Sequence, residues 1–162
     1  MASAREILLG LEQFGIRLGL DHLRELAAAL GHPERSTPAV LVAGTNGKGS
    51  VAALLASIAQ AAGLDAGLYT SPHLENVEER IRVGGLEIPA ADLGELLREV
   101  TLAAGRLGHA SPTYFEAMTL AALLHFARRQ VDLAVLEVGM GGRLDATNLA
   151  DGQLAVITSI AL

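Results

Sequence analysis

The sequence predicts an α/β fold in which a mostly parallel sheet is flanked by helices. Short apolar runs that end at glycine or at a polar turn indicate buried strands, and segments with helical periodicity separate them. This alternation is typical of a parallel sheet that is covered on both faces. The expected strands span residues 38–43, 66–70, 131–138 and 154–158, with a β-hairpin at 80–89. The expected helices span residues 3–13, 21–30, 51–62, 90–106 and 114–129.

The first elements of the chain are two amphipathic helices followed by a strand. Asp21 is the expected N-cap of the second helix, and Gly31 with Pro33 marks its end. The segment from Pro38 to Ala43 is apolar and stops at Gly44, as a short buried strand does.

The later elements repeat this order of strand, polar loop and helix. A glycine-rich turn from Gly44 to Ser50 leads into the third helix. Residues 71–80 are polar and irregular, and Gly84-Gly85 is the expected turn of the hairpin. The third long strand leads into a second glycine-rich loop at residues 139–151. Because ligands of such sheets bind beyond the carboxyl ends of the strands, the three loops are expected to converge on one rim.

The composition predicts one globular domain and argues against several classes of protein. The chain has 162 residues, 51% of them hydrophobic, which is enough for one ordinary core. A formal net charge of -6, with scattered basic residues, argues against nucleic-acid binding. No apolar run is long enough to span a membrane and no signal peptide is evident, so a cytoplasmic protein is expected. The lack of cysteine excludes a thiolate metal site.

The strongest signal for function is the glycine-rich turn Gly44-Thr45-Asn46-Gly47-Lys48-Gly49-Ser50. Glycines allow N–H groups to point at phosphate oxygens, and the next helix adds its positive N-terminal end. Lys48, the only lysine of the chain, is expected to reach the outer phosphates, and Ser50 to contact phosphate or magnesium. Gly49 separates these two residues, so the strict P-loop pattern is not met. A glycine-rich turn without a ligand is the alternative.

The turn resembles the form of this loop in the Mur ligase superfamily, whose members make amide bonds through an acyl phosphate. Three further stretches resemble the folylpolyglutamate synthase/dihydrofolate synthase family within it. They are Tyr69 to Leu74 with Glu79 to Val83, Thr113 to Glu116, and Leu136 to Asn148. The resemblance covers nearly the whole chain. It implies a P-loop, Mur-ligase-like ATP-binding domain and a ligase that adds L-glutamate to dihydropteroate or folates, with ATP and Mg²⁺ as cofactors and Lys48 as the catalytic cation.

The resemblance also implies that Ser71 and Glu137 are magnesium ligands, with Ser50 as a further candidate. Glu137 is a lone carboxylate at the carboxyl end of an apolar strand, and carboxylate and hydroxyl oxygens suit magnesium. An exposed charge at a strand end is the alternative for Glu137. An ordinary turn is the alternative for Ser71, because Ser-Pro commonly starts one.

A pterin-bearing substrate is implied, by the same resemblance, to contact two stretches of the chain. They are Thr113, Tyr114, Phe115 and Glu116, and Leu144, Asp145 and Ala146. The aromatic rings offer flat faces, and the two carboxylates can accept hydrogen bonds from ring amino groups. A helix N-cap by Thr113 with a capping box closed by Glu116 is the alternative for the first stretch, with Phe115 in the core.

Other polar residues near these stretches are weaker candidates. His73 is a candidate for a phosphate or substrate contact, with a structural role as the alternative. Arg143 lies in the second glycine-rich loop and is a candidate for an anion contact. Arg80 and Arg82 alternate on the expected hairpin and are predicted to lie on a solvated face.

The resemblance implies that residues 1–162 are the N-terminal part of the ATP-binding domain. In that family a third metal ligand, a histidine, and a C-terminal domain for glutamate follow. The chain alone is therefore expected to be inactive as a ligase. Another ligase of the superfamily that makes cell-wall precursors, a nucleotide-binding module without catalysis, and a fragment that binds nothing are the alternatives. The sequence does not indicate an oligomeric state.

Overall fold

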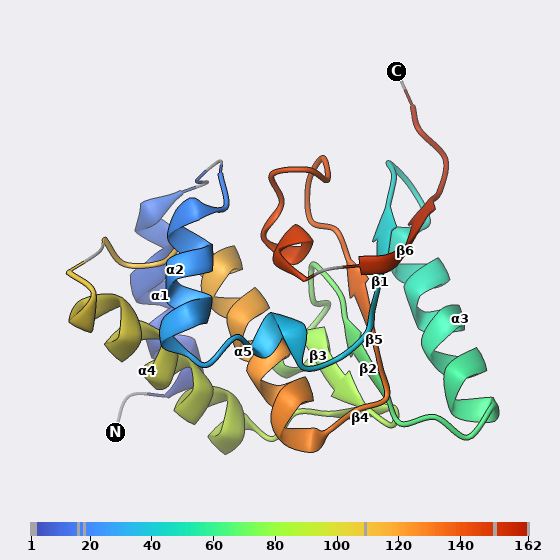
Figure 1. Ribbon diagram of the computed structural model, residues 1–162, viewed down its shortest axis with the longest axis horizontal. Coiled ribbons are helices and arrows are strands. Elements are labelled where there is room, and N and C mark those ends of the chain that lie inside the picture. The colour runs from blue at the N-terminus through green and yellow to red at the C-terminus, as the bar shows by residue number, and fades with distance from the viewer. Residues whose placement is uncertain (1–2, 16, 18, 109, 151, 162) are drawn as a thin grey trace.

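The fold is a six-stranded sheet with helices on both faces (Figure 1). The computed structural model describes residues 3–15, 17, 19–108, 110–150 and 152–161. The strands are β1 (Ala39–Ala43), β2 (Ala66–Tyr69), β3 (Ile81–Val83), β4 (Leu86–Glu87), β5 (Leu133–Glu137) and β6 (Gly152–Ile157). Their order is β4-β3-β2-β5-β1-β6, in which β2, β5, β1 and β6 pair in parallel and β3 and β4 form the antiparallel hairpin. The predicted α/β class with a mostly parallel sheet is confirmed.

The helices divide unequally between the two faces of the sheet. They are α1 (Ala4–Leu11), α2 (Asp21–Ala29), α3 (Lys48–Ala61), α4 (Ala90–Arg106) and α5 (Tyr114–Arg129). Helix α3 covers one face alone, and α5 covers the other, with α4, α1 and α2 packed beyond it (Figure 1). None of the described helices is long and apolar enough to cross a membrane.

Two hydrophobic clusters hold these layers together. The smaller one joins small side chains of α3, among them Ala52 and Ala56, to Val42 and Val135 of the sheet. The larger one joins α1, α2, α4 and α5 to the opposite face, where Phe126 is almost completely buried. Truncating a buried phenylalanine to alanine typically costs about 3–5 kcal/mol, so α5 is the helix on which this second layer depends.

One predicted helix start and one predicted N-cap differ from the structure. Helix α3 begins at Lys48 and not at residue 51, because Gly47 adopts a left-handed φ of 80° and serves as its N-cap. Asp21 is the first residue of α2 and not its cap; its carboxylate pairs instead with Arg24 at 3.0 Å. The starts and ends of α4 and α5 agree with the prediction.

The two loops predicted to be irregular each contain a short 3-10 helix. Val77–Arg80 forms one of them directly before β3. Ala146–Leu149 forms the other, and Asp145 caps it by accepting a hydrogen bond from the N–H of Thr147. Asp151, at the end of the second loop, lies outside the described residues. Both segments place side chains at the carboxyl ends of the parallel strands.

Candidate functional site

The glycine-rich turn connects β1 to α3, and the segment that follows β6 holds its backbone. The N–H of Thr45 donates to the carbonyl of Ser159 at 2.8 Å, and Thr158 Oγ1 donates to the carbonyl of Asn46 at 2.7 Å. Gly44 has a φ of 134°, and a Cβ at this position would collide with Thr158. Glycine is therefore required here by both backbone conformation and space.

Lys48 is the first residue of α3, and its side chain folds back over the turn. Its Nζ donates to the carbonyls of Gly44 and Thr45 at 3.0 and 3.2 Å. Ser50 lies exposed on the same first turn of the helix. An ammonium, a hydroxyl and the N-terminal end of a 14-residue helix thus meet at one place, and such a place attracts phosphate.

Glu137 joins the loops that follow β1, β2 and β5. It is the last residue of β5, it is 6% exposed, and its Oε2 accepts a hydrogen bond from the N–H of Ser71 at 2.9 Å. The same oxygen would lie 3.3 Å from a Cβ at Gly49. The residue that breaks the strict P-loop pattern is therefore the one that packs against this carboxylate. The predicted convergence of the three loops is confirmed in its geometry.

The donor set around Glu137 suits magnesium. Ser71, whose N–H contacts Glu137, adds a hydroxyl oxygen, and Ser50 at the start of α3 is a further candidate. In the part of the chain that the structure describes, no group of three or more His, Asp or Glu side chains could hold a metal ion. A metal held here would take further oxygens from a nucleotide and from water. Magnesium commonly binds in this manner, through one or two protein oxygens and substrate phosphates.

A cavity of about 320 Å³ lies beside this rim. Most of the residues predicted to contact substrate line it, together with Ser71, which also touches the candidate metal site. They are Thr113, Phe115, Glu116, Leu144, Asp145 and Ala146. The arrangement brings the two predicted stretches, about 30 residues apart in sequence, to one cavity next to the phosphate loop.

The two carboxylates of this cavity also have structural partners. Asp145 accepts from Thr147 Oγ1 at 2.6 Å and from the N–H of Met140 at 2.8 Å, so it organises the second glycine-rich loop. Glu116 accepts from the N–H of Thr113 at 2.7 Å, and Thr113 Oγ1 accepts from the N–H of Glu116 at 3.2 Å. The capping-box interpretation of this pair is confirmed, and both of its residues still line the cavity.

The prediction that Arg80 lies on a solvated face is wrong. Arg80 ends the 3-10 helix, and its side chain turns inward to a buried position in the cavity wall. Its Nε donates to Nδ1 of His73 at 2.9 Å, and its guanidinium lies 5.1 Å from the ring centroid of Tyr114. Arg82 is partly exposed and pairs with Glu87 at 3.2 Å.

His73, Tyr114 and Arg143 are not among the residues that line the 320 Å³ cavity. His73 and Tyr114 line a separate hollow of about 390 Å³ between α1 and the loop after β2. Burial raises the pKa of the Tyr114 phenol, so this side chain stays neutral near pH 7. Arg143 is exposed, and its carbonyl accepts a hydrogen bond from Nδ2 of Asn148.

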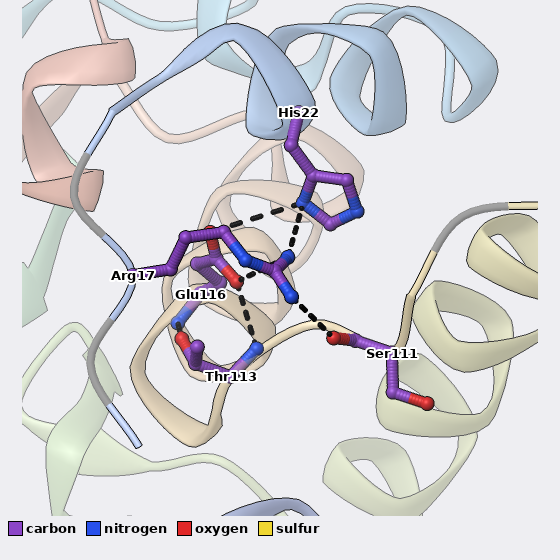
Figure 2. A network of polar contacts seen from close by, with 5 residues as sticks. All are labelled: Arg17, His22, Ser111, Thr113 and Glu116. Carbon is purple, nitrogen blue, oxygen red and sulfur yellow. Dashed lines mark hydrogen bonds and ion pairs between the residues drawn. The ribbon is translucent and has the colours of Figure 1, made fainter. Parts of the chain in front are cut away.

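Arg17 also lines the cavity, although no local pattern in the sequence marks it. It lies between α1 and α2, and its guanidinium reaches the start of α5 (Figure 2). Its Nη1 lies 2.9 Å from Nδ1 of His22 and 3.6 Å from Oε2 of Glu116, and its Nη2 donates to the carbonyl of Ser111 at 3.3 Å. A single arginine whose partner lies 94 residues away leaves no local pattern.

Comparisons with known proteins agree with this geometry. The chain is 46% identical over 162 residues to the dihydrofolate synthase/folylpolyglutamate synthase of Escherichia coli (strain K12). This match covers 100% of this chain and 38% of that protein. It is 42% identical over 161 residues to the protein of the same name from Bacillus subtilis (strain 168), covering 97% of this chain and 37% of that protein. The chain thus spans well under half the length of these curated relatives.

Solved structures give the same result. The chain superimposes on E. coli FolC in complex with DHPP and ADP with a TM-score of 0.92 at 45% identity, over 99% of this chain and 39% of that one. A bifunctional folylpolyglutamate synthase/dihydrofolate synthase from Yersinia pestis, complexed with AMPPNP and Mn ion, superimposes with a TM-score of 0.89 at 41% identity. This match covers 100% of this chain and 40% of that one. Residues 42–161 match the model of the Mur ligase middle domain, and the chain therefore belongs to the Mur ligase family.

Proposed function

We propose that this chain carries the nucleotide, magnesium and pterin sites of an ATP-dependent ligase that adds L-glutamate to dihydropteroate or folates. The observation that carries the proposal is the meeting of the Lys48 turn, Ser71 and Glu137 at one rim, beside the 320 Å³ cavity. Similar structures hold ADP with DHPP, or AMPPNP with Mn, and this supports both halves of the site. The similar proteins are longer, so the complete reaction is proposed for a ligase of their length.

The phosphate loop would bind ATP through the N–H groups of residues Gly44 to Ser50 and through the Lys48 ammonium. On binding, Lys48 would exchange the two loop carbonyls that it now contacts for phosphate oxygens, with which its charge interacts more strongly. Ser50, Ser71 and Glu137 would hold magnesium, which supplies charge neutralisation at the phosphates when bound.

The cavity residues would hold the pterin ring beside this rim. Phe115 offers an apolar surface, and Glu116 and Asp145 offer carboxylate oxygens for N–H donors of the ring. Arg143 and His73 lie outside the cavity and would act on the anionic part of a ligand from its periphery. Tyr114 would act through Arg80, over which its ring is stacked.

The reaction assigned to this site needs no nucleophilic side chain. A carboxylate oxygen of the substrate forms a bond to the γ-phosphorus of ATP as the bond to ADP breaks. The amine of glutamate then attacks the activated carbonyl carbon, phosphate leaves, and the amine loses a proton. Lys48 would stabilise the charge of the transferred phosphoryl group, and the protein would contribute mainly by positioning and electrostatics.

A nucleotide titration tests the proposal directly. Lys48→Ala should weaken ATP binding by about 10–100-fold, which corresponds to the loss of a charge-assisted contact. Arg106→Ala removes an equal charge from an exposed position on α4 and should leave the affinity unchanged. An amine-directed reagent gives a second readout, because Lys48 is the only lysine and bound ATP should protect it. Equal labelling with and without ATP in the folded chain would overturn the assignment.

A further inference from the structure

The Glu116 carboxylate in the cavity wall has capacity for another hydrogen bond. The residue is 4% exposed, and Oε2 accepts from the N–H of Thr113. Oε1 is buried and has no hydrogen-bond partner among the described residues. Buried polar atoms are nearly always paired in folded proteins, because an unpaired one forfeits its hydration. Glu116 also lines the cavity, so a ring N–H donor seated against its carboxylate would supply the missing hydrogen bond by reaching Oε1.

Arg17 prevents His22 from donating a hydrogen bond to Oε1 of Glu116. Nδ1 of His22 lies 3.8 Å from Oε1 of Glu116, and a small shift of the ring would bring it into hydrogen-bond range if the nitrogen carried a proton. The guanidinium of Arg17 has donors only, so Nδ1 must accept in its 2.9 Å contact with Arg17. A nitrogen that accepts from Arg17 has no proton to give to Glu116. Figure 2 shows the three side chains converging in this way.

Arg17 also balances the charge of the carboxylate. Its Nη1 lies 3.6 Å from Oε2, close enough for an ion pair and too far for a good hydrogen bond. The carbonyl of Ser111 fixes the other end of the guanidinium at 3.3 Å. The arginine is thus held by the segment before α5 and by α2, and the carboxylate is stabilised without losing its open oxygen.

We propose that Arg17 is a positioning residue that keeps Glu116 as an open carboxylate acceptor, and that the cavity thereby selects ring ligands with amino N–H donors over otherwise equal ligands with a carbonyl. The inference rests on the proposed function and adds to it the residue that sets ring selectivity. A carbonyl oxygen facing Glu116 would leave two acceptors opposed and unpaired, which costs more than the hydrogen bond alone.

Pterin and lumazine are the probes for this test, because they share the pteridine ring and differ by an amino group or a carbonyl at position 2. Their dissociation constants are measured by fluorescence titration on the full 162-residue chain. The wild-type chain should bind pterin at least about tenfold more tightly than lumazine. Arg17→Met should bring the ratio to within about threefold, because His22 can then donate to Oε1. Arg17→Lys should restore part of the preference.

Two further variants separate selectivity from stability. Arg24→Met removes an exposed arginine of α2 that pairs with Asp21, and should keep the wild-type ratio. Glu116→Gln places an amide N–H donor in the cavity wall and should reverse the preference toward lumazine, which gives a result even if Arg17→Met fails to fold. An unchanged ratio in Arg17→Met, or equal binding of the two probes by the wild-type chain, would overturn the inference.

The nucleotide titration keeps this inference distinct from the proposed function. Suppose that ATP binding depends on Lys48 but that the pterin preference is the same with and without Arg17. This result would reject the positioning role of Arg17 and would still support the proposed ligase site. Loss of ATP binding to the wild-type chain would reject the ligase site itself. Binding of neither pteridine would reject both the substrate assignment and the role of Arg17.

Discussion

Glu137 shows how one side chain can connect three loops. It accepts from the Ser71 N–H after β2, it ends β5, and it packs against Gly49 at the start of α3. Val42 of β1 pairs in register with it, so the parallel sheet itself sets its position beside the phosphate loop. A carboxylate so placed has one oxygen committed to the backbone and another available to a metal ion.

Glu137→Gln should therefore separate metal binding from nucleotide binding. The amide oxygen can still accept from Ser71, so the loop should stay in place while the negative charge is lost. ATP affinity in the presence of magnesium should fall by about tenfold or more, and affinity in EDTA should change little. Calorimetric titration with and without magnesium measures this, with the exposed Glu95→Gln as the control. Unchanged magnesium dependence would return Glu137 to a purely structural role.

Residue roles could be predicted from the sequence where their partners are close in the chain. Thr113 and Glu116 are three residues apart, and their capping box was readable from residue types alone. Arg17 and Ser111 are 94 residues apart, and nothing local marks either of them. Arg80 was assigned to the wrong environment because alternation along a hairpin does not show that a 3-10 helix ends there.

At the scale of elements, the sequence located most helices and strands and missed details where glycine is involved. The apolar spacing of α4 and α5 fixed both of their ends. Helix α3 starts three residues before its predicted start, because Lys48, Gly49 and Ser50 resemble a loop until Gly47 turns the chain into the helix. The shift matters for function, since it puts Lys48 and Ser50 on the helix N-terminus.

The loop after β2 depends on a single carboxylate. Glu79 accepts hydrogen bonds from the N–H groups of Leu74, Glu75 and Asn76 at 3.0, 2.8 and 2.6 Å. These backbone hydrogen bonds, from Asn76 above all, lower the pKa of Glu79 from its ordinary value of 4.5 to about 2. The folded pKa is the lower one, so the ionised carboxylate stabilises the fold fully above pH 4.5. That stabilisation is lost as the pH falls from 4.5 through about 2.

Glu79→Gln should thus destabilise the chain at neutral pH and less so in acid. Urea unfolding followed by circular dichroism at a series of pH values from 7 to about 2.5 gives the difference from wild type at each pH. The difference should be constant at higher pH and should shrink below pH 4.5. Glu78→Gln is the matched control, because Glu78 receives none of these three hydrogen bonds. A difference that grows on acidification would contradict the assignment.

Over the whole molecule, the sheet is covered unevenly. Helices α3 and α5 cover opposite faces of the central strands, whereas β6 lies at one edge of the sheet and is largely exposed (Figure 1). Leu154, Ile157 and Ile160 are exposed in this region. Two exposed side chains of α3, Leu54 and Ile58, add to the apolar surface of the molecule. Exposed edge strands and large apolar patches favour association between chains.

The purified chain should therefore associate at high concentration through the β6 edge. Ile157 is 64% exposed, so Ile157→Lys should weaken self-association without lowering the free energy of unfolding, because a charge on an edge strand opposes pairing with another strand. Leu102→Lys is the control, since Leu102 is 60% exposed but lies on α4, away from the sheet. Sedimentation equilibrium across a concentration series measures the change. If both variants reduce association equally, the added surface charge explains the effect and the edge of β6 is not the contact. If neither variant reduces it, the contact lies elsewhere, and Leu54 and Ile58 of α3 are the next positions to substitute.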